Sequence, residues 1–272
     1  MKTATLQMCS SPDVAANLAS ARALVTQAAA QGAELVLLPE YFCGMGLHDQ
    51  DKLAWAEDFG HGPIQDALAA WASEFGLWLI AGTLPLRGTA AQRVLNTSLL
   101  FNPQGRCSAR YDKIHLFRFG TEREQYDEAA VIQPGTQPVV ADITDRNGQP
   151  WRVGLSVCYD LRFPELYRRH AQAGADILVV PSAFTFTTGQ AHWEVLLRAR
   201  AVENQCFVLA AAQGGQHVNG RRTWGHSMAI NAWGEVLAQR TDPGPGVVLA
   251  ELDRAHLARV RRQLPALEHR VL

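Results

Sequence analysis

The chain has 272 residues, of which 47% are hydrophobic and 19% are charged. This composition can build a packed hydrophobic core, so it excludes a disordered chain. The formal net charge is −1 at neutral pH, which gives no electrostatic reason to expect a nucleic-acid or anionic-membrane partner. No apolar run approaches the roughly 20 residues of a membrane-spanning helix, and the N-terminus lacks the apolar core of a signal peptide. We expect a cytoplasmic protein.

Helices and strands are predicted to alternate along the first part of the chain. Residues 13–31 have apolar side chains at helical spacing, and an apolar strand over residues 34–38 follows directly. A second helix begins at Pro63 and ends at Gly76, and residues 77–81 again form a strand pattern. This alternation predicts an α/β fold.

The two halves of the chain resemble each other. Residues 32–39 (Gly-Ala-Glu-Leu-Val-Leu-Leu-Pro) are echoed by residues 174–181 (Gly-Ala-Asp-Ile-Leu-Val-Val-Pro). Farther along, the spacing of Ser, Asn and Gly at positions 98, 102 and 105 recurs at positions 227, 231 and 234. Two such halves bury their apolar faces most simply as a four-layer αββα sandwich, in which 102–105 and 231–234 are hairpin turns. We expect one domain over residues 1–272, with a C-terminal helix and tail from about residue 253.

Cysteine usage favours a reactive thiol over a metal site. The cysteines are odd in number, widely spaced and without a C-x-x-C pair, so we expect no metal and no cofactor. Cys158 follows an apolar strand pattern and precedes a helix pattern, which would expose a nucleophile at the sheet edge near backbone N–H groups. The alternative is that Cys158 is an unreactive residue of the hydrophobic core.

A carboxylate and an ammonium group are candidates for activating this thiol. Glu40 directly follows the buried strand 34–38; if its strand and that of Cys158 are parallel neighbours, both residues emerge at the same sheet edge. Lys113, one of only three lysines, follows another strand. Its charge would lower the thiol pKa, stabilise an oxyanion and offset a buried Glu40. The alternatives are a structural role for Glu40 and an exposed, inert Lys113.

Three segments around these residues resemble the signature segments of the nitrilase superfamily of carbon-nitrogen hydrolases. They are Pro39-Glu40, Asp112-Lys113-Ile114-His115-Leu116, and Cys158-Tyr159-Asp160-Leu161-Arg162-Phe163-Pro164-Glu165. The resemblance covers nearly the whole chain and implies an αββα fold, a homodimer and a Glu-Lys-Cys triad. It implies that Glu40 is the general base, Lys113 the oxyanion stabiliser and Cys158 the nucleophile.

The resemblance also implies a second glutamate between the lysine and the cysteine. Glu128, within Tyr126-Asp127-Glu128, matches this position and would orient the lysine and the substrate amine. Glu122 and Glu124 are close neighbours in the sequence.

Several segments after Pro181 resemble the Nit1-like branch of the superfamily, which acts as deaminated glutathione amidase. They include residues 182–189 (Ser-Ala-Phe-Thr-Phe-Thr-Thr-Gly), 191–201 and 210–213 (Ala-Ala-Ala-Gln). This resemblance implies that a small-molecule amide is the substrate and that Arg162, Phe184, Thr188 and Tyr159 bind it. A guanidinium at position 162 could bind the carboxylate of a keto acid through two hydrogen bonds. The alternative for Arg162 is a structural ion pair with Glu165 or Asp160.

Other functions remain open at this stage. Within the superfamily, the rivals are an ω-amidase acting on α-ketoglutaramate, a nitrilase and a carbamoylase. A cysteine phosphatase is excluded because its C-x-x-x-x-x-R motif would need arginine where Pro164 stands. A Cys-His protease would need His192 or His226 beside Cys158. A non-catalytic binding module would not need the three polar residues together.

Overall fold

The computed structural model describes residues 1–120 and 125–271. Its α-helices are α1 (Val14–Ala30), α2 (Asp51–Trp55), α3 (Pro63–Phe75), α4 (Pro164–Gln172), α5 (Phe186–Asn204) and α6 (Arg254–Gln263), and short 3₁₀ helices cover Glu128–Ala130 and Cys158–Arg162. In these two described ranges, no helix is both long enough and apolar enough to cross a membrane.

The strands form two large sheets and two small ribbons. The first sheet has the order β17-β1-β2-β3-β5-β4, with β6 also paired to β5; its strands are β1 (Lys2–Gln7), β2 (Leu35–Leu37), β3 (Trp78–Ile80), β4 (Leu84–Arg87), β5 (Val94–Phe101), β6 (Cys107–Asp112) and β17 (Gly246–Glu251). The second has the order β16-β15-β12-β11-β10-β9; its strands are β9 (Val139–Thr144), β10 (Pro150–Leu155), β11 (Ile177–Val179), β12 (Phe207–Ala210), β15 (Met228–Ile230) and β16 (Val236–Gln239). The ribbons pair β7 (Arg118–Gly120) with β8 (Gln125–Asp127), and β13 (Gly214–Gln216) with β14 (Arg222–Trp224).

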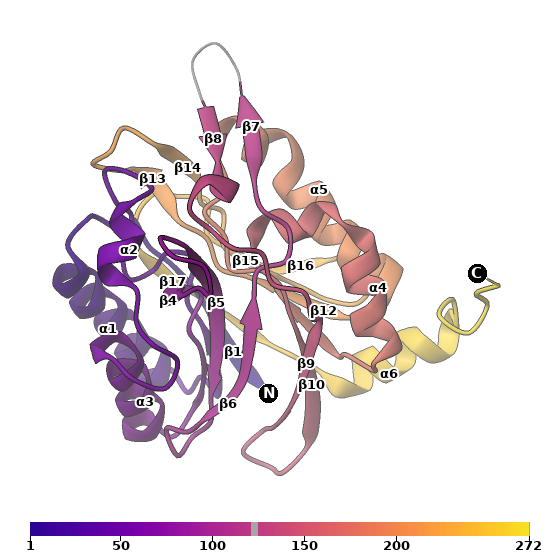
Figure 1. Cartoon of the computed structure of the whole chain (residues 1–272). Helices are drawn as coiled ribbons and strands as arrows, with labels where there is room; N and C mark the ends of the chain where they lie inside the picture. Colours follow the sequence, from indigo (N-terminus) through magenta and orange to yellow (C-terminus); the bar gives the residue numbers. More distant parts are fainter. Residues whose placement is uncertain (121–124, 272) are drawn as a thin grey trace.

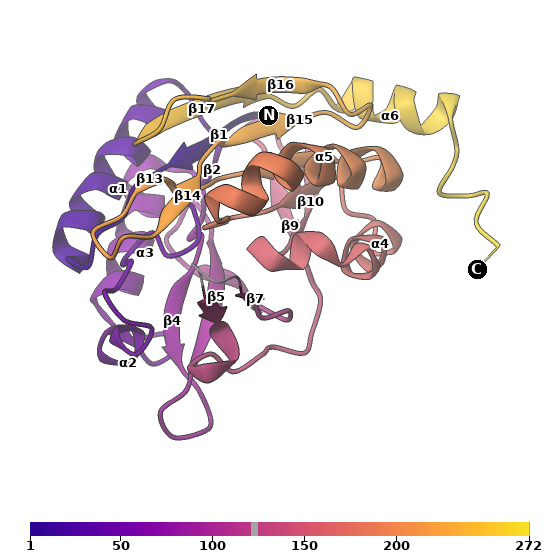
Figure 2. The same ribbon diagram turned by 90° about the horizontal axis from the view of Figure 1, so that it is seen from above.

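The sheets stack face to face with helices on both outer sides, which confirms the four-layer αββα sandwich. Helices α1 and α3 cover the first sheet, and α4 and α5 cover the second (Figures 1 and 2). Side chains alternate across β2: Leu35 and Leu37 join the cluster that contains Leu155 of the second sheet, whereas Val36 joins the cluster that contains Leu24 of α1. Because successive strand residues point to opposite faces, an unbroken apolar run fills both core layers.

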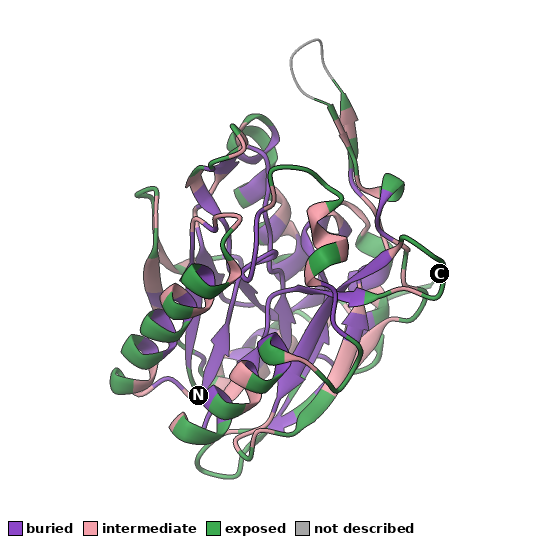
Figure 3. Ribbon diagram, turned by 60° about the vertical axis from the view of Figure 1, so that its left-hand side comes forward, coloured by how far each residue is buried: buried purple, intermediate pink, exposed green. Residues whose placement is uncertain are grey.

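Burial follows this layering. The central strands such as β2, β5, β11 and β12 are buried, the edge strands such as β6 and β16 are partly exposed, and the outer helices expose the sides that face away from the sheets (Figure 3). Helix α1 begins where the sequence predicts, because the Asp13 side chain accepts a hydrogen bond from the backbone N–H of Ala16 at 3.0 Å. Helix α3 ends at Gly76, whose φ of 59° is a left-handed conformation that glycine adopts readily.

The internal repeat is visible in the topology. In the first half β1, β2 and β3 are parallel and are followed by the antiparallel pair β5 and β6; in the second half β10, β11 and β12 are parallel and are followed by β15 and β16. The predicted hairpin turns match in detail. Asn102 accepts backbone hydrogen bonds from Gln104 and Arg106 through its side chain, and Asn231 does the same for Trp233 and Glu235.

One prediction about the sheets is wrong. The strands before Glu40 and Cys158 are not neighbours in one sheet: β2 pairs with β1 and β3, whereas β10 pairs with β9 and β11 in the other sheet. Apart from β17, which joins the first sheet, each half of the repeat builds its own sheet, so the two residues approach each other across the stacking of the sheets. The carboxyl ends of β2 and β10 therefore serve one site from different layers.

Candidate active site

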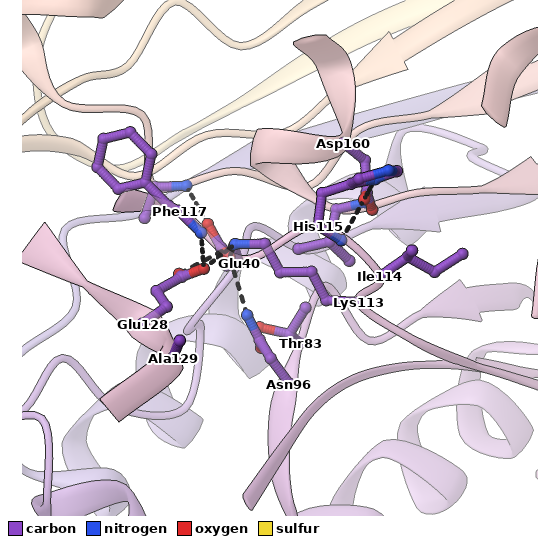
Figure 4. A network of polar contacts seen from close by, with 12 residues as sticks. Glu40, Thr83, Asn96, Lys113, Ile114, His115, Phe117, Glu128, Ala129 and Asp160 are labelled. Carbon is purple, nitrogen blue, oxygen red and sulfur yellow. Dashed lines mark hydrogen bonds and ion pairs between the residues drawn. The ribbon is translucent and has the colours of Figure 1, made fainter. Parts of the chain in front are cut away.

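Lys113 lies at the centre of a buried polar network. It directly follows β6, and its side chain has no solvent exposure. Its Nζ donates hydrogen bonds to Oε1 of Glu40 at 2.9 Å and to Oε2 and Oε1 of Glu128 at 2.8 and 3.0 Å (Figure 4). The alternative of an exposed surface lysine is wrong. A compact ammonium group between two carboxylates suits lysine better than the larger, planar guanidinium.

Glu40 is held in one orientation from several sides. It lies just beyond β2 and is 1% exposed. Besides Lys113, its Oε1 accepts a hydrogen bond from Nδ2 of Asn96 at 2.9 Å, and its Oε2 accepts one from the backbone N–H of Ala183 at 2.8 Å. These donors stabilise a carboxylate that would otherwise be costly to bury.

Glu128 begins the 3₁₀ helix that follows β8. Its Oε1 accepts a hydrogen bond from the hydroxyl of Tyr41 at 2.8 Å, and its Oε2 accepts one from the backbone N–H of Phe117 at 2.7 Å. Glu128 thus contacts Lys113 directly, as expected for the second glutamate that the resemblance implies. Glu122 and Glu124 lie outside the described residues.

Cys158 begins the 3₁₀ helix after β10. Its φ of 49° is rare for a residue with a side chain, and a hydrogen bond from its backbone N–H to the carbonyl of Pro181 at 2.9 Å fixes this turn. The expected exposure of the thiol is wrong, because Cys158 is only 7% exposed. It lies in the wall of a narrow pocket lined by Phe117, Cys158, Tyr159, Ala183, Phe184, Thr185 and Thr188.

Lys113 and Glu128 remain charged although they are buried. Burial alone would lower the pKa of Lys113, but the carboxylates of Glu128 and Glu40 outweigh this effect and raise it. Burial alone would raise the pKa of Glu128, but the charge and hydrogen bonds of Lys113 lower it. Lys113 is therefore an ammonium and Glu128 a carboxylate throughout the neutral pH range.

The thiol of Cys158 is protonated in the resting site. Burial raises its pKa most, the negative charge of Glu40 raises it further, and Lys113 only partly offsets these two effects. Lys113 lowers the thiol pKa, as expected, but burial and Glu40 outweigh this effect, so that the pKa lies above its usual value. Attack by this sulfur needs a base that removes its proton as the new bond forms, and Glu40 is close enough to influence the thiol directly.

Asp160 ties the turn of Cys158 to the segment that carries Lys113. Its Oδ1 accepts hydrogen bonds from the backbone N–H of His115 at 3.0 Å and from Nδ1 of the same residue at 2.7 Å. Its Oδ2 accepts from the hydroxyl of Tyr111 at 2.7 Å and from the backbone N–H of Val157 at 2.8 Å. One fully buried carboxylate thus links the two sheets at the site.

Three of the four predicted substrate residues line the pocket, and Arg162 lies against two of them. Phe184 and Thr188 are nearly buried, and Tyr159 lies next to the cysteine in the pocket wall. The guanidinium of Arg162 lies 5.3 Å from the ring centre of Phe184 and 5.9 Å from that of Tyr159. Its hydrogen-bond partner is Nδ1 of His192 at 3.3 Å, so the structure does not form the ion pairs considered for Arg162.

Sequence reasoning missed several residues of the site. Asn96 begins the polar run Asn96-Thr97-Ser98 in the middle of β5, which is otherwise apolar, and an amide within a strand pattern indicated a buried group that needs a hydrogen-bond partner. Tyr41 follows Glu40 with a φ of 57°, and no pattern in the sequence indicates its contact with Glu128.

The histidines proposed for a protease have other contacts. His192 lies against Arg162, and the ring of His226 stacks on Trp224 with centres 4.0 Å apart. The geometry favours Glu40 over either histidine as the base near Cys158.

Comparison with known proteins places this geometry in a family. Residues 2–262 match the family described as carbon-nitrogen hydrolase. The chain is 40% identical over 272 residues to the deaminated glutathione amidase of Yersinia enterocolitica, covering 98% of this chain and 91% of that protein. Its structure resembles that of the NitFhit protein of C. elegans, with a TM-score of 0.89, 37% identity and coverage of 99% of this chain but 65% of that one. It also resembles Saccharomyces cerevisiae Nit3, with a TM-score of 0.88, 29% identity and coverage of 100% and 97%. The chain belongs to the carbon-nitrogen hydrolase family.

Proposed function

We propose that the protein is an amidase that uses Cys158 as its nucleophile. The observation that carries this proposal is the buried network in which Lys113 bridges Glu40 and Glu128 beside the thiol. Burying an ammonium group and two carboxylates is costly for stability alone, and it provides a base and a fixed positive charge for catalysis.

In this mechanism Glu40 takes the proton of the Cys158 thiol as the sulfur attacks the amide carbonyl. Lys113 and the backbone N–H of Tyr159 donate hydrogen bonds to the oxyanion, while Glu128 orients Lys113. Glu40 then gives its proton to the departing amine, which leaves a thioester on the sulfur. Glu40 next removes a proton from water, the hydroxide attacks the thioester and displaces the thiolate, and the thiolate takes the proton back from Glu40, which gives the acid product and the free thiol.

We propose deaminated glutathione as the substrate, cleaved to α-ketoglutarate and Cys-Gly. The name of the Yersinia relative and its identity over nearly the whole chain support this assignment. The guanidinium of Arg162, beside Phe184 and near Tyr159, is available to bind the keto-acid carboxylate, and Thr188 lines the same pocket. The second candidate is an ω-amidase acting on α-ketoglutaramate, because this amide carries the same acyl group.

The test compares the wild-type protein with Cys158→Ala and Cys107→Ala. Cys107 is an exposed cysteine outside the network, so its variant controls for loss of a thiol. We expect the wild type and Cys107→Ala to release Cys-Gly from deaminated glutathione, and Cys158→Ala to keep its fold without turnover. Wild-type turnover in Cys158→Ala would contradict the nucleophile assignment, and exclusive release of ammonia from α-ketoglutaramate would favour the ω-amidase.

We also propose that two copies of the chain associate through the outer face of the second sheet. The apolar side chains of Val195 and Val202 on α5 are 62% and 51% exposed, and Trp233 and Leu237, at the hairpin of β15 and β16, are 53% and 42% exposed. Large apolar side chains grouped on one face are typical of a protein interface. Light scattering on the purified protein measures the molecular mass in solution and thus shows whether two copies associate.

A cytoplasmic location and a role in metabolite repair complete the proposal. The cysteines Cys9, Cys43, Cys107, Cys158 and Cys206 are free thiols, as in proteins of a reducing compartment. Fractionation of cells that make the protein tests the location.

A further inference from the structure

A polar groove of about 500 Å³ adjoins the pocket that contains Cys158, and Arg221 connects the two. It is lined by Gly46, Leu47, His48, Asp49, Gln125, Tyr126, Asn219, Gly220 and Arg221. Neither the proposed catalytic residues nor those proposed to hold the keto acid line this groove. Arg221 is the connection, because it lines the groove and also contacts Ala183, which lines the pocket.

Arg221 is a cation without an acidic partner among residues 1–120 and 125–271. Its Nη2 donates a hydrogen bond to the carbonyl of Ala183 at 3.1 Å, and its guanidinium lies 4.9 Å from the ring centre of Tyr126. Its Nε is buried and has no hydrogen-bond partner in the same described ranges. A guanidinium with unused, partly desolvated donors is suited to an incoming carboxylate.

The groove is built before any ligand arrives. The side chain of Asn219 donates a hydrogen bond to the carbonyl of Gly46 at 2.7 Å and accepts one from the backbone N–H of Arg221 at 3.0 Å. The first bond connects the two walls of the groove, and the second fixes the backbone from which the guanidinium extends. Such preorganisation reduces the entropy lost on binding.

Glu40 indicates which part of a substrate would reach Arg221. In the proposed mechanism the departing nitrogen lies within hydrogen-bond reach of Glu40, which returns a proton to it. The Oε2 of Glu40 accepts from the N–H of Ala183, and the carbonyl of that same residue accepts from Arg221. A substituent on the departing nitrogen that follows this wall leads to Arg221, away from the acyl part near Arg162 and Phe184.

We infer that this groove is the leaving-group subsite and that Arg221 binds a carboxylate carried by the departing amine. The preferred substrates are then amides of amino acids or short peptides with a free C-terminal carboxylate. This inference rests on the proposed function and extends it, because it concerns the amine side of the cleaved bond.

The experiment compares three substrates that share one acyl group. Deaminated glutathione releases a dipeptide with a carboxylate, its C-terminal carboxamide releases the same dipeptide without that charge, and α-ketoglutaramate releases ammonia. We expect Arg221→Met to lower kcat/KM for deaminated glutathione by about 10- to 100-fold, the loss of a hydrogen-bonded charge pair, and to change the other two by less than about threefold. Arg221→Lys should restore part of the loss. Arg222→Met, at the exposed neighbour that stacks on Phe186, is the matched control and should leave all three values unchanged.

The outcomes separate this inference from the proposed function. Equal losses of kcat/KM on all three substrates in Arg221→Met, or no loss on any, would overturn the subsite. If the wild type hydrolyses none of the three substrates, the proposed function fails, and the leaving-group subsite is then tested by measuring ligand binding. In that case calorimetry with Cys-Gly and its carboxamide on Cys158→Ala measures the subsite alone. Tighter binding of the free carboxylate that is lost in the double variant Cys158→Ala/Arg221→Met supports it, and equal affinities contradict it.

Discussion

The carboxylate of Asp160 accepts hydrogen bonds from both the backbone nitrogen and the ring nitrogen of His115. Asp160 belongs to the short helix that begins with Cys158, and His115 lies two residues beyond Lys113. This pair therefore fixes the distance between the sulfur of the proposed nucleophile and the ammonium group that would stabilise the oxyanion. A buried carboxylate with four donors holds its position better than a neutral amide would.

We expect Asp160→Asn to lower kcat strongly while the protein still folds. An amide cannot accept all four hydrogen bonds, and its NH₂ group would face N–H donors. The free energy of unfolding should fall by about 2–4 kcal/mol, the range for breaking a buried charged network. Urea unfolding and steady-state kinetics measure the two effects. The control is Asp142→Asn, at an exposed surface ion pair with Arg152, which should change neither by a measurable amount. An Asp160→Asn enzyme with wild-type kcat would refute the positioning role.

Glu128→Gln tests how the second glutamate acts on Lys113. The negative charge of Glu128 helps raise the pKa of Lys113, so its removal lowers that pKa. If protonated Lys113 is needed for catalysis, the alkaline limb of the kcat profile moves to lower pH, and kcat at its maximum falls about 100-fold. Asp127→Asn is the neighbouring control, because its side chain caps the 3₁₀ helix, which an amide oxygen can still do, and its 3.9 Å ion pair with Arg118 is solvent-exposed. An alkaline limb at the wild-type pH in Glu128→Gln would show that this charge does not tune the lysine.

We expect the folded protein to lose stability in mild acid because of the buried side chain of His170. The side chain is fully buried, and its Nε2 donates a hydrogen bond to the carbonyl of Leu155 at 2.9 Å. Burial lowers its pKa from 6.5 to about 4. Between these values the unfolded chain binds a proton that the folded chain does not, so stability falls as the pH falls from 6.5 to 4. The full effect is about 3 kcal/mol.

Urea unfolding at pH 7, 6, 5 and 4 measures this loss of stability in the wild type and in His170→Gln. The variant should lose much less free energy of unfolding over this range, since glutamine does not titrate. His269→Gln, at an exposed histidine, should retain the wild-type slope. A wild-type slope in His170→Gln would show that other groups cause the acid sensitivity.

The fold was predictable where short segments carry their own signals. The caps at Asp13 and Gly76 and the side-chain turns at Asn102 and Asn231 are local, and the repeat indicates that the same arrangement occurs twice. The sheet to which each strand belongs was not predictable, because the apolar residues of β2 and β10 would fit the core of either sheet. Their pairing depends on the whole repeat, which a single strand does not reveal.

The site was predictable in its charged residues and less so in their surroundings. Glu40 and Lys113 interrupt apolar segments, and this contrast is visible in the sequence. Arg221 lies in a polar loop where an arginine is ordinary, and its contact with Ala183 joins residues 38 positions apart. The thiol pKa of Cys158 depends on burial and on the sum of opposing charges, which only coordinates provide.

Because the two sheets are stacked, the protein should lose activity before its strands unfold. Glu40 and Lys113 come from the half with the first sheet, and Cys158 comes from the other half. Neither half alone contains a working set of reacting groups, and a slip of one layer over the other separates the base from the sulfur while every strand keeps its partners. Turnover thus reports the alignment of the layers, and it should vanish at lower denaturant than the circular dichroism of the strands.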